Sequence, residues 1–282
     1  MSDTLYRFTF DHANVRGTIV QMDASYAEAR KRLRGDMLSS ELLGQALCAS
    51  LLMSAHIKTP GTLAIQAVGS GPVSLLLAEA THQRNVRGIV RLNSPPESSD
   101  LRALLGDDGR MAVTITPQEG NRYQGVVPLE HASLSACLEG YFLQSEQLPT
   151  RLWLVADAHR AAGLMLQVLP AEQRADDADW VHLTTLADTV TEDELLHLPP
   201  TDLLYRLFHE EDARVYDPEN VRYACTCSEQ RTLEAICQLG REEAFSILDE
   251  QGAIEVQCQF CNQPYRFDRA RIEKLFADPT LH

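Results

Sequence analysis

The sequence predicts an α+β fold: an N-terminal mixed β-sheet packed with helices, an acidic helical linker, and a small C-terminal unit that contains four cysteines. Three observations predict this organisation. Strand-like alternation is interleaved with helical patterns as far as residue 169. The composition then shifts at Pro170 toward acidic, helix-forming residues, and four of the seven cysteines gather near the C-terminus. We therefore divide the chain into residues 1–170, 171–222 and 223–282.

The N-terminal region alternates short apolar strands with fewer, longer helices. Strands are expected at 4–10, 14–20, 62–68, 73–79, 86–93, 110–116, 122–128, 151–158 and 163–169. Helices are expected at 23–33, 39–56, 99–105 and 133–146. The second of these helices has a wide apolar face, which predicts that it is buried. Hairpin-like turns between the strands favour a layered α+β structure.

No pattern in the chain indicates a catalytic site, so we expect a protein that is not an enzyme. The sequence has neither Gly-x-Ser-x-Gly nor His-Glu-x-x-His. His56, His82 and His131 are scattered singly and are expected to be surface histidines or hydrogen-bonded ones. The glycine pair in Gly69-Ser70-Gly71-Pro72 predicts a turn, because no Gly-Lys-Ser/Thr follows it and the next element is a strand.

Charge and hydropathy exclude several partners. The formal net charge of −15 opposes binding to nucleic acid, which needs a basic surface. The N-terminus has no apolar signal region, and no apolar run approaches the roughly 18–20 residues that span a bilayer. We therefore expect a cytoplasmic protein that binds neither nucleic acid nor membrane.

The acidic linker carries most of the net charge. Residues 171–220 contain fourteen carboxylates, three arginines and no lysine, a balance of −11. Helical patterns cover 176–198 and 201–209, and Thr191 to Glu194 forms a capping box. Helices this short and self-repelling need a surface on which to lie. The segment is either a plain interdomain linker or a releasable one whose apolar stripes become available when it detaches.

The four clustered cysteines form two short-spaced pairs. Cys225 and Cys227 are separated by one residue, and Cys258 and Cys261 by two. This spacing is a strong signal for a tetrahedral zinc site. Two residues of extended chain advance roughly 6.6 Å, which is within disulfide range of the Cα atoms. The same thiolates could therefore hold zinc when reduced or close two short disulfides when oxidised. The other cysteines are expected to be buried thiols: Cys48, Cys137 and Cys237.

The C-terminal unit is small enough to depend on a metal. Its expected elements are helices from Ser228 to Leu239, from Arg241 to Leu248 and from Asp268 to Phe276, with strands at 254–258 and 265–267. Domains this small bury only about 60% of their chain surface and often need disulfides or a bound metal ion to be stable. Structural zinc contributes about 10–16 kcal/mol, against about 5–15 kcal/mol for a whole domain. Loss of the thiolate ligands by oxidation would then unfold the unit. A permanently closed structural site is the alternative.

Several stretches of the chain resemble the redox-regulated thirty-three-kilodalton chaperonin family of the bacterial cytosol. The resemblance runs from about Tyr6 to Phe276, and the arrangement of the two cysteine pairs is its most specific part. The stretches that carry it are Gly69 to Pro72, Leu77 to Ala80, Val86 to Gly88, Tyr141 to Pro149, Tyr223 to Ser228, Gly240 to Glu243, Ile254 to Cys261 and Tyr265 to Asp268.

The resemblance implies an ATP-independent holdase that protects unfolding proteins under oxidative stress. In the reduced state the four cysteines bind zinc and the protein is inactive. Oxidation then releases zinc and forms two disulfides, Cys225–Cys227 and Cys258–Cys261. The C-terminal unit and the linker unfold, surface for unfolded client proteins is exposed, and the active form is a homodimer.

Two other classes of protein compete with this interpretation. A zinc-ribbon module for nucleic acid is opposed by the net charge and by the absence of a basic, aromatic stripe. A thiol–disulfide oxidoreductase would use Cys258 and Cys261. Such enzymes place the pair at the start of a helix, whereas here it lies between strand-like segments.

Overall fold

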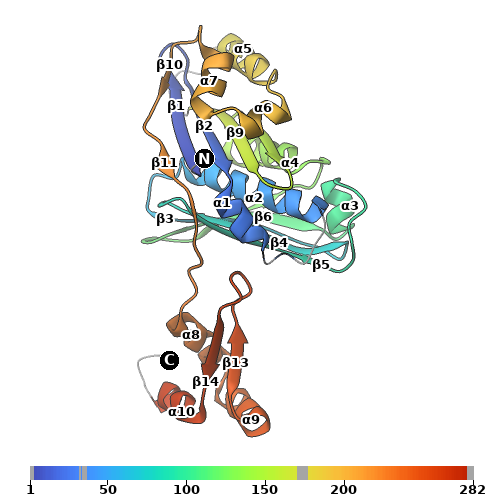
Figure 1. Cartoon of the computed structure of the whole chain (residues 1–282), viewed down its shortest axis with the longest axis vertical. Helices are drawn as coiled ribbons and strands as arrows, with labels where there is room; N and C mark the ends of the chain where they lie inside the picture. The colour runs from blue at the N-terminus through green and yellow to red at the C-terminus, as the bar shows by residue number, and fades with distance from the viewer. Residues whose placement is uncertain (1–2, 32, 34–36, 170–176, 278–282) are drawn as a thin grey trace. The chain divides into compact units, whose positions relative to one another are not determined.

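The computed structural model describes residues 3–31, 33, 37–169 and 177–277. The chain forms two compact units, Met1–Ala224 and Cys225–His282, and each is described by itself (Figure 1). Three expectations fall partly outside the described residues: the boundary between 170 and 171, a helix beginning at 176, and a helix reaching Leu33 without interruption.

The first unit contains an antiparallel sheet in the order β10-β1-β2-β9-β8. Its strands are β1 (Thr4–Phe10), β2 (Val15–Met22), β8 (Thr150–Ala156), β9 (Ala161–Val168) and β10 (Ala213–Val215), and β11 (Glu219–Asn220) also pairs with β1. Phe8 lies opposite Gly17, and a Cβ at Gly17 would come 2.0 Å from the Phe8 ring. A side chain there would displace the ring, so this position requires glycine.

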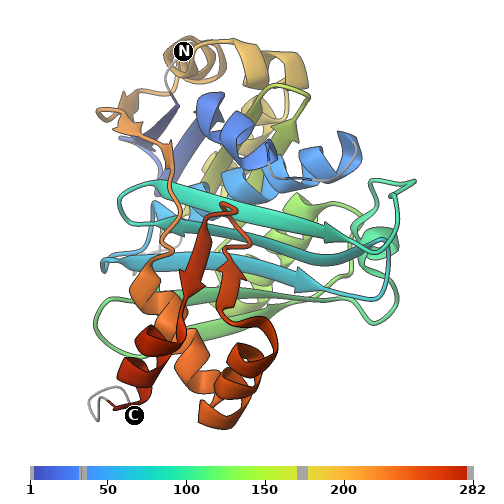
Figure 2. The same cartoon turned by 60° about the horizontal axis from the view of Figure 1, so that its bottom comes forward.

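The second sheet of this unit has the order β12-β5-β4-β3-β6-β7 (Figure 2). Its strands are β3 (Gly61–Val68), β4 (Val73–Thr81), β5 (Asn85–Leu92), β6 (Arg110–Pro117), β7 (Tyr123–Val127) and β12 (Arg222–Tyr223). β12 runs parallel to β5, and the other pairs are antiparallel, so the sheet is mixed. The predicted α+β class is confirmed.

Helix α2 (Met37–Ser54) packs against strands of both sheets and fills the main core. Gly44 permits this approach, since a Cβ there would come 2.6 Å from the Ala156 Cβ. The expectation that no apolar run reaches membrane-spanning length was wrong. The eighteen residues of α2 meet that length with a mean hydropathy of 1.2, because six leucines, two methionines and two alanines stand beside a single charged residue, Glu41. The helix is 78% buried inside the unit, which makes it a core helix.

Three further helices complete this part of the unit: α1 (Ala24–Arg30), α3 (Leu101–Leu105) and α4 (Leu134–Tyr141). The single helix expected at 133–146 is instead α4 followed by a π-helical turn, Phe142–Glu146. The Tyr141 hydroxyl donates a 2.9 Å hydrogen bond to Oε1 of Glu146. That hydrogen bond joins the π-helical turn to the buried Tyr141. The spacing of apolar residues in the sequence does not predict it.

The helices of the acidic segment lie on the outer face of the first sheet: α5 (Asp177–Ala187), α6 (Glu192–His197) and α7 (Pro200–Phe208) (Figure 1). Phe208 packs against Phe8 and Phe10, with ring centroids 5.8 and 5.1 Å apart. Within the described residues 177–198, the helical pattern is divided between α5 and α6. The predicted capping box at Thr191 is present and begins α6.

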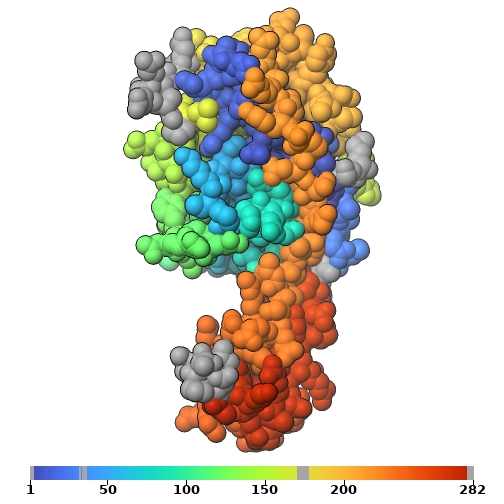
Figure 3. Space-filling view, turned by 90° about the vertical axis from the view of Figure 1, so that its left-hand side faces the viewer, coloured from blue at the N-terminus to red at the C-terminus, as the bar shows by residue number. Residues whose placement is uncertain are grey.

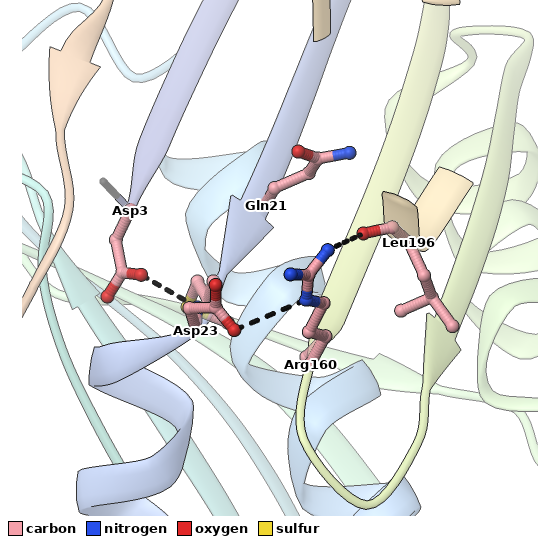
Figure 4. A pocket seen from close by; sticks show the side chains of 7 residues that line it. Asp3, Gln21, Asp23, Arg160 and Leu196 are labelled. Atoms are coloured by element: carbon pink, nitrogen blue, oxygen red, sulfur yellow. Dashed lines mark hydrogen bonds and ion pairs between the residues drawn. The ribbon is translucent and has the colours of Figure 1, made fainter. Parts of the chain in front are cut away.

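The carbonyl end of α6 is fixed by two side chains, which we call the α6 clamp: Gln21 on β2 and Arg160 in the turn just before β9. Gln21 Nε2 donates to the carbonyls of Leu195 (2.8 Å) and Leu198 (2.7 Å). Arg160 donates to the Leu196 carbonyl (3.2 Å) and pairs with Asp23 (3.4 Å) (Figure 4). The last carbonyls of a helix have no partner within the helix, and the clamp supplies one.

After α7 the chain runs beside β1 as β10 and β11 and then beside β5 as β12, and none of these strands was predicted. In Figure 3 this segment lies as an orange band on the surface of the first unit. Val215 pairs with Phe8 on β1. Glu219 then forms ion pairs with Arg7 and with the buried Arg84, both at 2.9 Å. The tail of the acidic segment, residues 213–223, is therefore held to this unit by strand pairing and by charge.

The second unit has the elements that the sequence predicts. They are α8 (Glu229–Leu239), α9 (Arg241–Gln251), the hairpin of β13 (Ile254–Gln257) and β14 (Pro264–Phe267), and α10 (Arg269–Ala277). Its core contains eight buried side chains: Leu233, Ile236, Ala244, Leu248, Ile254, Phe267, Ile272 and Leu275. A core this small provides little stability of its own.

Candidate metal centre

The structure brings the four predicted cysteines together in the second unit. Their Sγ atoms all lie within 4.8 Å of one another. Cys225 Sγ lies 3.6 Å from Cys258 Sγ, and Cys227 Sγ lies 3.3 Å from Cys261 Sγ. With zinc–sulfur bonds of about 2.3 Å, the edge of a tetrahedral site is about 3.8 Å. None of the four is in a disulfide. The donors and their spacing therefore fit a tetrahedral zinc ion.

The second pair is held by a tight turn between β13 and β14. The Cys258 amide donates to the Gln263 carbonyl (2.9 Å), and the Asn262 amide donates to the Cys258 carbonyl (2.8 Å). Asn262 has a φ of 56°, in the left-handed region that asparagine tolerates better than most residues. This turn places Cys258 and Cys261 on one side of the hairpin end.

The first pair is held from the start of α8. Ser228 caps the helix by accepting a 3.2 Å hydrogen bond from the Arg231 amide. The Arg231 guanidinium reaches back to the carbonyl (2.9 Å) and hydroxyl (2.7 Å) of Thr226, the residue between Cys225 and Cys227. The capped helix thereby fixes the loop that carries both thiols.

Tyr265 is a further member of the site that the sequence did not reveal. Its hydroxyl donates a 3.2 Å hydrogen bond to Cys227 Sγ. The β13–β14 register pairs Tyr265 with Val256, two residues before Cys258, and so places the tyrosine beside the cysteines. That register becomes visible only once the hairpin is formed.

Three of the thiols, Cys225, Cys227 and Cys261, differ in pKa. Burial raises the pKa of Cys225, and burial followed by hydrogen bonding with Cys227 raises the pKa of Cys261 to about 12. Burial also acts to raise the pKa of Cys227, but the Tyr265 hydroxyl and the neighbouring thiols lower it to about 7. Cys227 is therefore the first of these three to ionise, and a bound cation displaces the remaining protons.

The other cysteines and the histidines within the described residues lie outside this cluster. Cys48 and Cys137 are buried and Cys237 is partly buried against the core of the second unit, none of them in a disulfide. The His56 ring shares a 2.7 Å hydrogen bond with Thr18. Within the described ranges, the four clustered cysteines are the one group of histidine, cysteine and acidic side chains placed to hold a metal ion.

Comparison with known proteins identifies the family. The sequence model of the family described as Hsp33 protein matches residues 3–268. The chain is 50% identical to the 33 kDa chaperonin of Hahella chejuensis over 283 residues, which cover 100% of this chain and 99% of that relative. The chain belongs to the Hsp33 family. Its 33 kDa chaperonin relative in Nitrosococcus oceani is 47% identical, with 98% of this chain and 95% of the relative covered. The Hsp33 homologue of Thermotoga maritima, a crystal structure, matches with a TM-score of 0.82 at 25% identity over 98% of each chain.

Family membership and the cysteine cluster together decide between the three classes considered from sequence. The protein is a chaperone of the Hsp33 family and not an enzyme, and its clients are unfolded proteins. Its C-terminal cluster of four thiols suits zinc and makes it a redox-regulated holdase. The nucleic-acid module and the oxidoreductase are set aside.

Proposed function

We propose that Cys225, Cys227, Cys258 and Cys261 are the zinc ligands of the reduced, inactive protein. Oxidation then joins Cys225 to Cys227 and Cys258 to Cys261 and releases the metal. The observation that supports this assignment is the convergence of four Sγ atoms within 4.8 Å in a unit whose hydrophobic cluster has eight buried side chains among the described residues. A unit of that size depends on its metal for stability.

The redox step balances with peroxide as the oxidant. Each cysteine pair gives up two electrons when its sulfur–sulfur bond forms, and these electrons reduce one hydrogen peroxide to two water molecules. Complete oxidation of the zinc-bound cluster therefore consumes two hydrogen peroxide molecules and four protons. It yields two disulfides, four water molecules and one free Zn²⁺, because a disulfide sulfur is no longer a thiolate ligand.

Unfolding of the second unit is proposed to release the acidic linker, residues 171–222. The apolar side of α7, which includes Leu203, Leu207 and Phe208, is buried against the outer face of the first sheet. Its detachment would expose both that stripe and the sheet residues Phe8 and Phe10 as client-binding surface. We further propose that the activated form is a homodimer and that it acts in the cytoplasm.

One titration tests the switch. Reduced, zinc-loaded protein is treated with hydrogen peroxide at raised temperature, and zinc release, free thiols and suppression of client aggregation are followed together. We expect one zinc per chain to leave as the seven thiols of the chain fall to three. Client protection should appear in parallel with a shift from monomer to dimer, seen as a smaller elution volume in size-exclusion chromatography. Zinc release with both disulfides formed but no client protected would overturn the switch.

The disulfide pairing needs its own measurement, because the sulfur contacts of 3.6 and 3.3 Å join one pair to the other. Trypsin cleavage after Arg222, Arg231, Arg241 and Arg266 puts the first pair in peptide 223–231 and the second in peptide 242–266. The proposed pairing gives two separate peptides, each two hydrogens lighter than its reduced form. Disulfides across the pairs would instead give one linked species. Cys237→Ser, outside the cluster, is the matched control and should give the same map.

A further inference from the structure

A groove of about 480 Å³ opens on the first unit and contains none of the four clustered cysteines. We call it the β1–β2 groove. Strands β1 and β2, the chain just after α2, and the tail of the acidic segment contribute to its wall. The polar side chains that line it are Arg7, Thr9, Arg16, His56, Lys58 and Tyr216.

The charge of the groove is opposite to that of the protein. Three cationic side chains line it and no carboxylate does, in a chain with 40 acidic and 25 basic residues. Arg7 is already paired with Glu219 at 2.9 Å. In the part of the chain that the structure describes, neither Arg16 nor Lys58 has an ion-pair partner within 4.0 Å. The groove therefore holds two cations that no described carboxylate neutralises.

Arg16 is the less exposed of these two cations. Its guanidinium is partly buried and donates through Nε (3.2 Å) and Nη2 to the amide oxygen of the buried Gln167, which carries no charge. A guanidinium removed from water and left without an anion retains unused donors. The nearby His56 is affected by the same positive charges. Burial, followed by the charges of Arg16, Arg84 and Arg7, lowers its pKa to about 3.

We propose that the β1–β2 groove binds a small phosphate-bearing anion. A guanidinium and an ammonium suit phosphate oxygens, the first as a planar fork and the second as a point charge. The hydroxyls of Thr9 and Tyr216, 3.3 Å apart, add donors at the rim. The groove volume of about 480 Å³ is larger than one phosphate group needs. The groove therefore suits a chain of two or three phosphates better than inorganic phosphate.

One wall of the groove belongs to the tail that leads to the second unit. The Tyr216 amide donates a 2.9 Å hydrogen bond to the Arg7 carbonyl, and β10 pairs with β1 beside it. An anion that contacts both Arg16 and Tyr216 binds only while this tail is docked. By linkage, it stabilises the docked state. This second step rests on the proposed function: the anion should then delay activation by peroxide.

The binding step is tested on reduced, zinc-loaded, full-length protein by isothermal titration calorimetry. Tripolyphosphate, pyrophosphate and inorganic phosphate are the probes, with sodium sulfate at matched ionic strength as the reference. Condensed phosphates bind zinc, so the zinc content of the protein is measured before and after. We expect tripolyphosphate to bind most tightly. Heats of equal size from sulfate would show a general salt effect and overturn the site.

Substitutions locate the site. The exposed Lys58→Gln should weaken tripolyphosphate binding by about threefold, as for a solvent-exposed ion pair. Arg16→Gln, at the partly buried position, should weaken it by about tenfold. Lys31→Gln is the matched control, since it removes the same charge just after α1, outside the groove. Wild-type affinity in both Lys58→Gln and Arg16→Gln would overturn the proposal.

The linkage step has a separate readout. Tripolyphosphate should slow hydrogen exchange of the amides in 213–216 and delay peroxide activation in wild-type protein but not in Arg16→Gln. Binding without either effect would overturn the linkage alone. Because calorimetry uses the reduced protein and no client, a failure of the redox switch and a failure of the anion site give different results.

Discussion

At the scale of single residues, the sequence revealed ligands but not the groups that support them. Cys225, Cys227, Cys258 and Cys261 were predictable because two short-spaced pairs form a local pattern. Tyr265 was not, because its contact with Cys227 depends on the register of β13 against β14. Side chains that support a ligand commonly come from a neighbouring strand, and single-sequence patterns do not record strand register.

Tyr265→Phe tests that supporting role. The substitution removes one oxygen and with it the hydrogen bond to Cys227 Sγ. We expect zinc affinity to fall by about tenfold, the lower end of the range for partners of metal ligands. Competition with a chromophoric chelator measures this, and zinc release by peroxide should also become faster. Tyr205→Phe, on the exposed side of α7, is the control. Equal affinities in the two variants would contradict the role assigned to Tyr265.

At the scale of elements, most helices and strands follow from apolar periodicity, whereas the short strands of the tail do not. β10, β11 and β12 contain two or three residues each, too few to show alternation. They are strands because β1 and β5 offer them an edge. Similarly, the sequence showed that the acidic helices need a surface, but the identity of that surface is a property of the tertiary fold.

The α6 clamp predicts how firmly that surface holds the linker. Gln21→Ala removes the hydrogen bonds to the carbonyls of Leu195 in α6 and of its C-cap Leu198, which should lower the free energy of local unfolding by about 1–2 kcal/mol. Hydrogen exchange of the α6 and α7 amides should become faster, and peroxide activation should occur at lower temperature. Arg160→Ala should act in the same direction.

A substitution outside the clamp provides the comparison. Arg214→Ala removes an exposed arginine of β10 whose ion pair with Asp11 spans 3.6 Å. Exposed pairs contribute about 0–1 kcal/mol, so α6 exchange should change little. If Arg214→Ala and Gln21→Ala accelerate α6 exchange equally, the clamp is not what holds the helix.

At the scale of the whole molecule, stability is distributed unevenly between the two units. The first unit encloses α2 between two sheets and carries a second core under the acidic helices. The second unit has eight buried core side chains around one hairpin and three helices. The sequence predicted this contrast through the apolar content of the two regions. The strand order of the two sheets was not predictable, because it is set by pairings between residues far apart in the chain.

Zinc removal under reducing conditions should therefore unfold one unit and leave the other folded. With a chelator and a non-thiol reductant present, no disulfide can substitute for the metal, and the second unit loses about 10–16 kcal/mol of apparent binding free energy. Calorimetry should show the lower-temperature transition disappear while the higher one remains. Limited proteolysis should cut selectively after residue 225. Leu47→Ala, in the fully buried part of α2, should instead lower the higher transition, by about 2–5 kcal/mol in stability. A single transition unaffected by the chelator would show that the C-terminal unit folds without its metal, and the redox switch would then lack its driving force.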